Sequence, residues 1–466
     1  MAGVALRNGA LGTLALIASV GAIYAGGSWY PGSPEPGSTG VPSVNSRNLT
    51  GGSVPTSVVP YSTTPHASSP VPVGTVSEAN AAGGALQPQP SSTSDEALQA
   101  FVAPLAPRRP AEADGVDLRR MIGQMLVVGF PGTAASEAWP SRAISWVHEG
   151  KVGGVLLLGR NVSSPGQLRM LTSRLIEAGG PVRPLIVIDQ EGGAVQRLTR
   201  EKGFRGLASA GEIARTADPI TAFTIYTRQA DELSAMGVNV NFGPVVDLAV
   251  GTSNPVISGL DRTYGAAPEA VLAYANAFIN AHRQKGVLIA AKHFPGHGSS
   301  AQDPHLTTVN VSERWSNLEL GPFIRLAKSD QTSMIMVGHL ILDGFSDGNR
   351  PTSLSRKAVT DKLRRDLGYD GLIVTDDLDM GAIRDQYSLE EAFVLAVAAG
   401  NDIVVHANTR TSDFDLVDKV TEAIVLAVSS GRIPRSQIEQ SYRRILSAKG
   451  SLASGRSPGG SELDRL

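Results

Sequence analysis

The sequence predicts a closed barrel of eight parallel strands covered by helices, the (β/α)8 fold. Eight short apolar runs recur along the chain, and helix-like amphipathic stretches lie between them. The runs are almost continuously apolar, which is typical of strands that are covered on both faces. Eight such units in about 330 residues suit this fold. A doubly wound open sheet would not require eight units, and no glycine-rich dinucleotide turn follows the first run.

The expected elements alternate between Val116 and Lys449. The eight expected strands are, in chain order, Met125–Phe130, Val152–Leu158, Leu185–Asp189, Val238–Asp247, Val287–Lys292, Thr332–His339, Leu372–Asp376 and Asp402–His406. The expected helices include Ile220–Met236, Pro268–Gln284, Ser355–Leu367, Leu389–Ala399 and Leu416–Ser429.

Polar residues follow four of the expected strands directly, as Asp189–Gly193, Lys292–Gly298, His339 and Asp376–Asp379. In this fold the carboxyl ends of the strands share one rim, where function collects. Charged groups after apolar strands are costly unless they serve a site or pair with one another. One such residue alone would be explained most simply as an ion pair. Four at one rim favour a functional site.

Two chemistries compete for this rim, and the first is metal-assisted hydrolysis by His293, His297, His305 and the aspartates. His293 and His297 have the i, i+4 spacing of a zinc-binding helix. Pro295 and the neighbouring glycines interrupt that interval, so the helix that would align the two imidazoles is not expected. We therefore expect neither a metal nor a cofactor.

The second chemistry is glycosyl transfer, which needs a carboxylate nucleophile and a separate acid/base group. Asp376 ends an expected strand and is therefore a rigidly placed carboxylate. Asp303 and His305 lie two residues apart on the loop after the fifth strand, so both could face one side of an extended segment. A carboxylate beside an imidazole orients it and raises its pKa. In isolation, however, an Asp-X-His motif is more simply explained as a surface pair.

Several motifs together resemble glycoside hydrolase family 3, and in particular its bacterial β-N-acetylglucosaminidases. In chain order they are Ile188–Arg197, Asn241–Asp247, Gly259–Arg262, Lys292–Gly298 and Gly371–Asp377. They span almost the whole periodic region in the order that the family has.

The resemblance implies a role for individual residues. Asp376 matches the family's nucleophile, His305 its histidine acid/base, and Asp303 the carboxylate partner of that histidine. The positions that match sugar-binding residues of the −1 subsite are Asp189, Arg197, Arg262, Lys292 and His293. The two arginines could instead simply pair with rim carboxylates. Asp377 and Asp379 are assigned structural roles, because the family match favours Asp376.

The chain departs from the family pattern at two positions. Pro304 stands between Asp303 and His305, where the family usually has a small polar residue. It restricts Asp303 toward extended geometry and should stiffen a loop that is expected to swing over the substrate. Ala194 stands where arginine is common. Neither departure removes a catalytic group.

The expected function is therefore an exported, retaining β-N-acetylglucosaminidase that hydrolyses terminal β-linked N-acetylglucosamine of cell-wall glycans. Phosphorolytic cleavage by the same site is an alternative, because a neutral histidine tolerates incoming phosphate better than a carboxylate. A non-catalytic module that binds wall glycans is another. β-Glucosidase activity is expected less, since no sandwich domain carrying a carboxylic acid/base follows the eighth strand.

Composition and the N-terminus bear on location and partners. The net charge is −2, with no basic block, so nucleic acid is not expected as a partner. Cysteine is absent, so there are no disulfides.

Arg7 precedes the uncharged stretch Gly9–Gly27, so residues 1–29 are expected to be a secretory signal or a membrane anchor. Residues 30–112 should form a disordered linker, because residues 31–110 hold 14 of the 29 prolines. The barrel is expected at 113–452, a flexible tail at 453–466, and the protein as a monomer.

Overall fold

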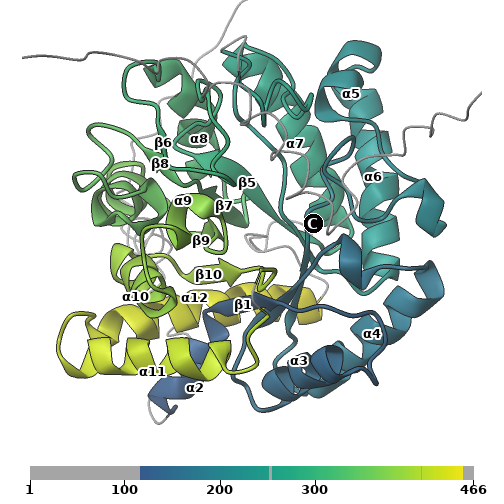
Figure 1. Ribbon diagram of the computed structural model, residues 1–466. Coiled ribbons are helices and arrows are strands. Elements are labelled where there is room, and N and C mark those ends of the chain that lie inside the picture. The colour runs from purple at the N-terminus through teal and green to yellow at the C-terminus, as the bar shows by residue number, and fades with distance from the viewer. Residues whose placement is uncertain (1–115, 251–253, 411, 455–466) are drawn as a thin grey trace, which may run out of the picture. The chain divides into compact units, whose positions relative to one another are not determined.

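The computed structural model describes residues 116–250, 254–410 and 412–454, and they form the (β/α)8 barrel that the sequence predicts (Figure 1). Eight parallel strands pair in the order β1-β2-β3-β4-β5-β7-β9-β10, and β10 closes the barrel against β1. The strands are β1 (Leu126–Gly129), β2 (Gly154–Leu157), β3 (Leu185–Ile188), β4 (Val240–Asn241), β5 (Leu288–Phe294), β7 (Met334–Val337), β9 (Leu372–Asp377) and β10 (Ile403–His406). Each of the eight lies within or overlaps its expected run.

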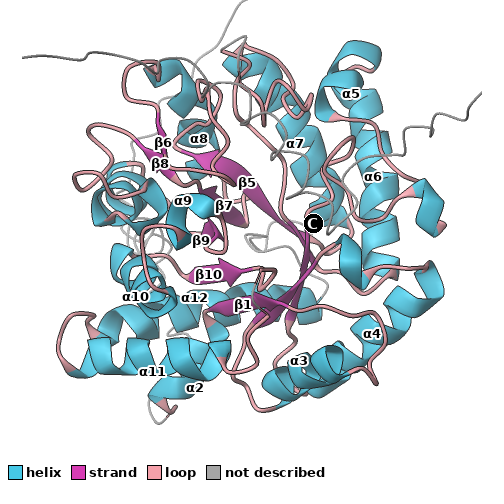
Figure 2. Ribbon diagram, viewed as in Figure 1, coloured by secondary structure: helices cyan, strands magenta, loops and turns pink. Residues whose placement is uncertain are grey.

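Helices surround these strands (Figure 2). They are α2 (Leu118–Gln124), α3 (Ala138–His148), α4 (Pro165–Ala178), α5 (Ala210–Thr216), α6 (Pro219–Ala235), α7 (Pro268–Gln284), α8 (Asn317–Ala327), α9 (Gly381–Arg384), α10 (Leu389–Ala399), α11 (Leu416–Ser429) and α12 (Arg435–Ser454). Short 3₁₀ turns occur at η1 (Gly159–Asn161), η2 (Arg200–Lys202) and η3 (Thr352–Leu354), and η4 (Lys357–Asp366) is π-helical. The five expected helices correspond to α6, α7, η4, α10 and α11.

Local sequence explains why several helices begin where they do. Ser164 precedes α4 and Asp218 precedes α6, and each side chain accepts a hydrogen bond from the main-chain N–H three residues later, at 3.2 and 2.7 Å. A proline occupies the first position of both helices, where its missing N–H costs nothing. Ser388 caps α10 in the same way, at 3.2 Å.

The fourth strand is much shorter than its expected run, Val238–Asp247. Only Val240 and Asn241 pair as β4, because Pro244 interrupts the run and cannot donate a ladder hydrogen bond. The chain then leaves the barrel wall, with one further bridge from Val245 to Lys292. This exit carries Asp247 to a buried position beside β5.

A small parallel sheet outside the barrel joins two of the rim loops. Its strands are β6 (Val309–Asn310) and β8 (Leu340–Ile341), which follow β5 and β7 in the chain. The loop at 295–308, which carries Asp303 and His305, is therefore held at one end by β5 and at the other by β6.

The predicted signal or anchor at 1–29 and the linker at 30–112 lie outside the described residues. Within the described part of the chain, none of the helices combines the length and the apolar character needed to cross a bilayer.

Candidate active site

Four of the eight predicted site residues lie in or directly after three strands whose carboxyl ends meet at one rim. Asp189 follows β3, Lys292 and His293 lie in β5, and Asp376 lies in β9. Residues far apart in the chain become neighbours there, since Lys292 Nζ lies 2.9 Å from Asp189 Oδ1. Arg197 completes this first group by donating from Nη2 to Asp189 Oδ2 at 3.2 Å.

A second group, centred on Glu191, lies beside the first. Arg262 clamps this carboxylate with two hydrogen bonds of 2.8 and 2.9 Å, and Lys292 Nζ lies 2.6 Å from it. All three side chains are almost completely buried. Burial alone would raise the pKa of Glu191, but the charges of Arg262 and Lys292 hold it far below its usual range. The carboxylate therefore stays ionised and balances two buried cations.

These contacts bear on the two arginines. Arg262 also donates from Nη1 to the carbonyl of Val256 at 3.0 Å, so each of its three nitrogens has a protein partner. Arg197 pairs with Asp189, and 16% of the Asp189 side chain is exposed at the rim. Both arginines thus do pair with carboxylates, which was the alternative open at the sequence level. These ion pairs hold both guanidinium groups in fixed orientations. Their role in sugar binding stays a prediction.

His293 is oriented by Asp247, to which the sequence assigns no role. The imidazole Nδ1 donates to Asp247 Oδ2 at 2.7 Å, and the main-chain N–H groups of His293 and His297 also donate to this carboxylate. Asp247 is fully buried. Burial opposes its ionisation, yet the charge and hydrogen bond of His293 lower its pKa. This arrangement fixes the tautomer of His293 and leaves its Nε2 free of the aspartate.

His297 does not share that role. It is buried, and burial together with the charge of His293 lowers its pKa to about 4, so it is neutral near pH 7. The rings of His293 and His297 pack edge to face, with centroids 5.5 Å apart. Among the described residues, no three His, Asp or Glu side chains are grouped so that they could hold a metal ion.

Asp376 is partly exposed and is hydrogen-bonded by the main-chain N–H of Asp377 at 2.8 Å. Burial would raise its pKa, but His293, His339 and that N–H lower it to about 2. His339, at the end of β7, is buried and donates from Nε2 to the carbonyl of Asp377 at 2.9 Å. Asp376 is therefore an ionised carboxylate near neutral pH.

Asp303 and His305 form a hydrogen-bonded pair at the surface of the rim. His305 Nδ1 donates to Asp303 Oδ1 at 2.7 Å, and the main-chain N–H of His305 donates to the same oxygen at 2.9 Å. Desolvation opposes protonation, but Asp303 and the negative charge of Asp376 raise the pKa of His305. The imidazole and the Asp376 carboxylate thus lie within electrostatic reach of each other.

The loop that carries this pair rests on the start of α9, the helix that follows β9. Gly381 N donates to the carbonyl of His305 at 3.1 Å, and Ala382 N donates to the carbonyl of Pro304 at 3.0 Å. A Cβ atom on Gly381 would lie only 2.7 Å from the His305 carbonyl oxygen. The segment after the Asp376 strand therefore supports the loop that carries His305.

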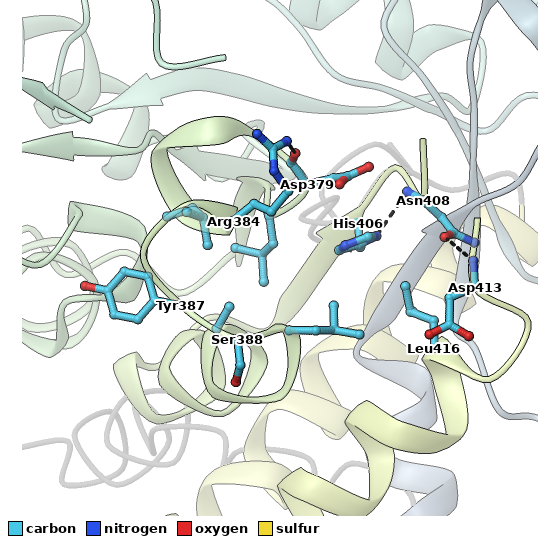
Figure 3. Close-up of a pocket in the computed structure, with 12 residues that line it drawn as sticks. Asp379, Arg384, Tyr387, Ser388, His406, Asn408, Asp413 and Leu416 are labelled. Atoms are coloured by element: carbon cyan, nitrogen blue, oxygen red, sulfur yellow. Dashed lines mark hydrogen bonds between the residues drawn. The ribbon is translucent and has the colours of Figure 1, made fainter. Parts of the chain in front are cut away.

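Asp377 and Asp379 turn away from this group. Asp377 accepts hydrogen bonds from the main-chain N–H groups of Ala407 and Asp379, and burial and the charge of Asp379 raise its pKa to about 7. Asp379 accepts one from Thr409 at 2.7 Å. Asp379 also lines a separate pocket between the segments after β9 and β10, together with Arg384, Tyr387, His406 and Asp413 (Figure 3).

All eight predicted site residues therefore lie on the rim segments, in contact pairs or within electrostatic reach of one another. The reasoning from sequence missed the parts played by Glu191 and Asp247. A signal was present for both, since each is a carboxylate within three residues of the end of an apolar run and within a motif of the resemblance. Arg262 and His293, the side chains to which they are hydrogen-bonded, lie 71 and 46 residues further along the chain.

Comparison with known proteins shows the family to which the chain is similar. The family described as "Glycosyl hydrolase family 3 N terminal domain" matches residues 117–448. Beta-hexosaminidase LpqI of Mycobacterium tuberculosis is 33% identical over 380 residues, covering 78% of this chain and 92% of LpqI. An uncharacterized secreted glycosyl hydrolase of Arthroderma benhamiae is 29% identical, covering 72% of this chain and 94% of that protein.

A solved structure with a similar fold is the glycoside hydrolase family 3 beta-N-acetylglucosaminidase of Paenibacillus sp. str. FPU-7. It superposes with a TM-score of 0.66 at 31% identity, covering 75% of this chain and 65% of that one. The chain thus spans slightly less than two thirds of the Paenibacillus protein.

Proposed function

Because the chain belongs to glycoside hydrolase family 3, we propose that it is a retaining β-N-acetylglucosaminidase that removes terminal β-linked N-acetylglucosamine. The relatives named beta-hexosaminidase and beta-N-acetylglucosaminidase support this substrate class. One observation carries the proposal: an ionised Asp376 lies within electrostatic reach of an imidazole that Asp303 holds by a 2.7 Å hydrogen bond.

In the first step Asp376 attacks the anomeric carbon and forms a glycosyl–enzyme ester. His305, protonated and steadied by Asp303, gives its proton to the departing glycosidic oxygen. In the second step the neutral imidazole accepts a proton from water, which attacks the anomeric carbon and releases Asp376. Its low pKa suits Asp376 to both steps, because the carboxylate attacks as an anion and leaves as one.

Sugar hydroxyl groups need fixed polar partners, and the first group of the rim offers them. Asp189 is partly exposed and held by Lys292 and Arg197, so its carboxylate can accept from a hydroxyl without moving. His293 is fixed by Asp247 and contributes a second oriented group. We assign these residues and Arg262 to the −1 subsite.

The test compares chromogenic N-acetylglucosaminide and glucoside with and without inorganic phosphate. We expect faster release from the N-acetylglucosaminide and no need for phosphate. Asp376→Asn should abolish turnover, whereas Asp366→Asn, which changes an exposed side chain paired with Lys362, should not. A fluorinated sugar that traps the intermediate should label Asp376. Labelling of another residue, or a strict requirement for phosphate, would contradict the mechanism.

The proposal also includes export and a cell-wall glycan as substrate. The apolar stretch Gly9–Gly27 after Arg7 supports export, as does the relative named as secreted. Mass analysis of the N-terminus, combined with cell fractionation, tests this part. Protein that carries all of residues 1–29 in the cytosolic fraction would contradict export.

A further inference from the structure

Lys449 of α12 is a buried lysine without a counter-charge. Only 4% of the residue is exposed, and its Nζ donates to Gln124 Oε1 and to the Gly153 carbonyl, both at 2.6 Å. Both partners are neutral, and no carboxylate of the described residues lies within ion-pair distance of this ammonium. A buried ammonium costs free energy unless an anion balances it. In keeping with this cost, desolvation lowers the pKa of Lys449 to about 7.

Lys449 lines a pocket at the end of the barrel opposite Asp376. The pocket is small, with a cavity volume of about 30 Å³, and its wall comes from α2, the end of α3, the segments before β2 and β3, and α12. Two further basic residues, Arg120 and His148, line it, and the lining contains no acidic residue. Arg120 lies against Gly150, with Nε 3.6 Å from the position of an added Cβ.

Two neighbouring basic side chains have carboxylate partners, whereas the three that line the pocket have none among the described residues. Arg119 pairs with Glu422 at 2.6 Å, and Lys151 pairs with Asp418 at 2.9 Å. By contrast, Arg120 and His148 have neither an ion pair nor a side-chain hydrogen bond within the described residues. Three basic residues therefore line one pocket, and none of them has a carboxylate partner among the described residues.

We propose that this pocket binds a small oxyanion of the phosphate class. Lys449 would contribute a buried point charge, and Arg120 a planar fork that matches two oxygens of one anion. His148 also lines the pocket and would add a donor for the anion. The site lies at the amino ends of the strands, so it stabilises the fold and takes no part in the chemistry at the opposite rim.

The test is thermal unfolding during titration with inorganic phosphate, against sodium chloride at equal ionic strength. We expect a saturable rise in Tm with phosphate. Lys449→Met and Arg120→Gln should each weaken phosphate binding about tenfold or more, the effect of losing one charge-assisted hydrogen bond. The kcat/KM for the chromogenic substrate should not change in either variant.

Arg120→Gln and His148→Gln alter exposed side chains, so they keep the test decisive if Lys449→Met fails to fold. The matched control is Arg119→Gln, whose side chain is next to Arg120 in the chain but paired with Glu422. An absent or unsaturable effect of phosphate would overturn the proposal. So would an effect that survives both Arg120→Gln and His148→Gln, because the anion would then bind elsewhere.

Discussion

His305 carries the proton that the proposed reaction transfers, and its neighbours determine the pH range in which that proton is present. Desolvation disfavours the imidazolium, but Asp303 and Asp376 outweigh it and raise its pKa. Asp376 has a pKa of about 2, so it is ionised across the whole range in which an enzyme is normally assayed. The two groups therefore have the required protonation states together from mildly acidic pH up to the pKa of His305.

This predicts how activity depends on pH. The kcat/KM should fall as pH rises through the raised pKa of His305, while the acid limb should lie too low to be reached before unfolding. Asp303→Asn removes the charge that supports the imidazolium, so the alkaline limb should move to lower pH. The control is Asp385→Asn, an exposed aspartate paired with Arg384. An alkaline limb that Asp303→Asn leaves in place would show that another group titrates.

The identity of the acid can be tested by varying the leaving group. His305→Ala should lower kcat/KM for natural glycans by roughly 10²–10⁴, the usual contribution of a positioned acid. Aryl glycosides with activated leaving groups need little protonation, so they should be spared. Equal losses on both kinds of substrate would mean that His305 is not the acid.

At the scale of elements, the central relationship is between the loop that carries His305 and the helix that follows Asp376. Gly381 N and Ala382 N hold this loop by its carbonyls at 3.1 and 3.0 Å. Gln386 adds a side-chain hydrogen bond to Thr308. The proposed nucleophile and acid are thus linked through α9 as well as through the barrel.

Gly381→Ala should therefore impair catalysis more than stability. The new Cβ would meet the His305 carbonyl at 2.7 Å and the Leu306 backbone at 3.0 Å, so the loop must move. We expect a fall in kcat/KM of roughly 10- to 100-fold, because displacement by about 1 Å has effects of this size. Gly166→Ala is the matched control, since no atom lies within 4 Å of the Cβ added there. Unchanged kinetics in Gly381→Ala would show that the loop position is not critical.

At the scale of the whole molecule, one buried carboxylate joins distant parts of the barrel. Asp402 is fully buried at the start of β10 and pairs with Arg364 of η4 at 2.5 Å and with Arg444 of α12 at 3.1 Å. It also accepts hydrogen bonds from Ser441 Oγ at 2.7 Å and from Ile373 N at 2.9 Å. The carboxylate of Asp402 therefore bonds to η4, to α12 and to the neighbouring strand β9 at the same time.

Asp402→Asn should destabilise the whole barrel, because it leaves two partly buried guanidinium groups without their counter-charge. We expect the free energy of unfolding to fall by roughly 3–5 kcal/mol, with a lower urea midpoint. Asp366→Asn is the control, since Asp366 makes an exposed pair with Lys362, and such pairs contribute at most about 1 kcal/mol. A midpoint that moves no more than in the control would show that the charge is not needed.

The sequence alone was enough for the barrel and for the main chemical groups of its rim. Eight apolar runs and the helices between them are local signals, because each element must bury its own apolar face. The positions of Asp376, Asp303 and His305 after strands placed them at the rim, whereas their roles as nucleophile and acid/base were implied by the family resemblance and stay predictions. Val238–Asp247 was the expected strand that shortened most, since Pro244 takes the chain out of the sheet.

Only the tertiary structure decided which charges meet. Asp247 orients His293 across 46 residues, Glu191 balances Arg262 across 71, and Gly381 supports the His305 loop. Sequence spacing contains no record of such pairings, because a buried charge is stabilised by whichever partner the closed barrel brings within a few ångströms. Local periodicity thus determined the scaffold, while long-range packing determined the electrostatics of the site.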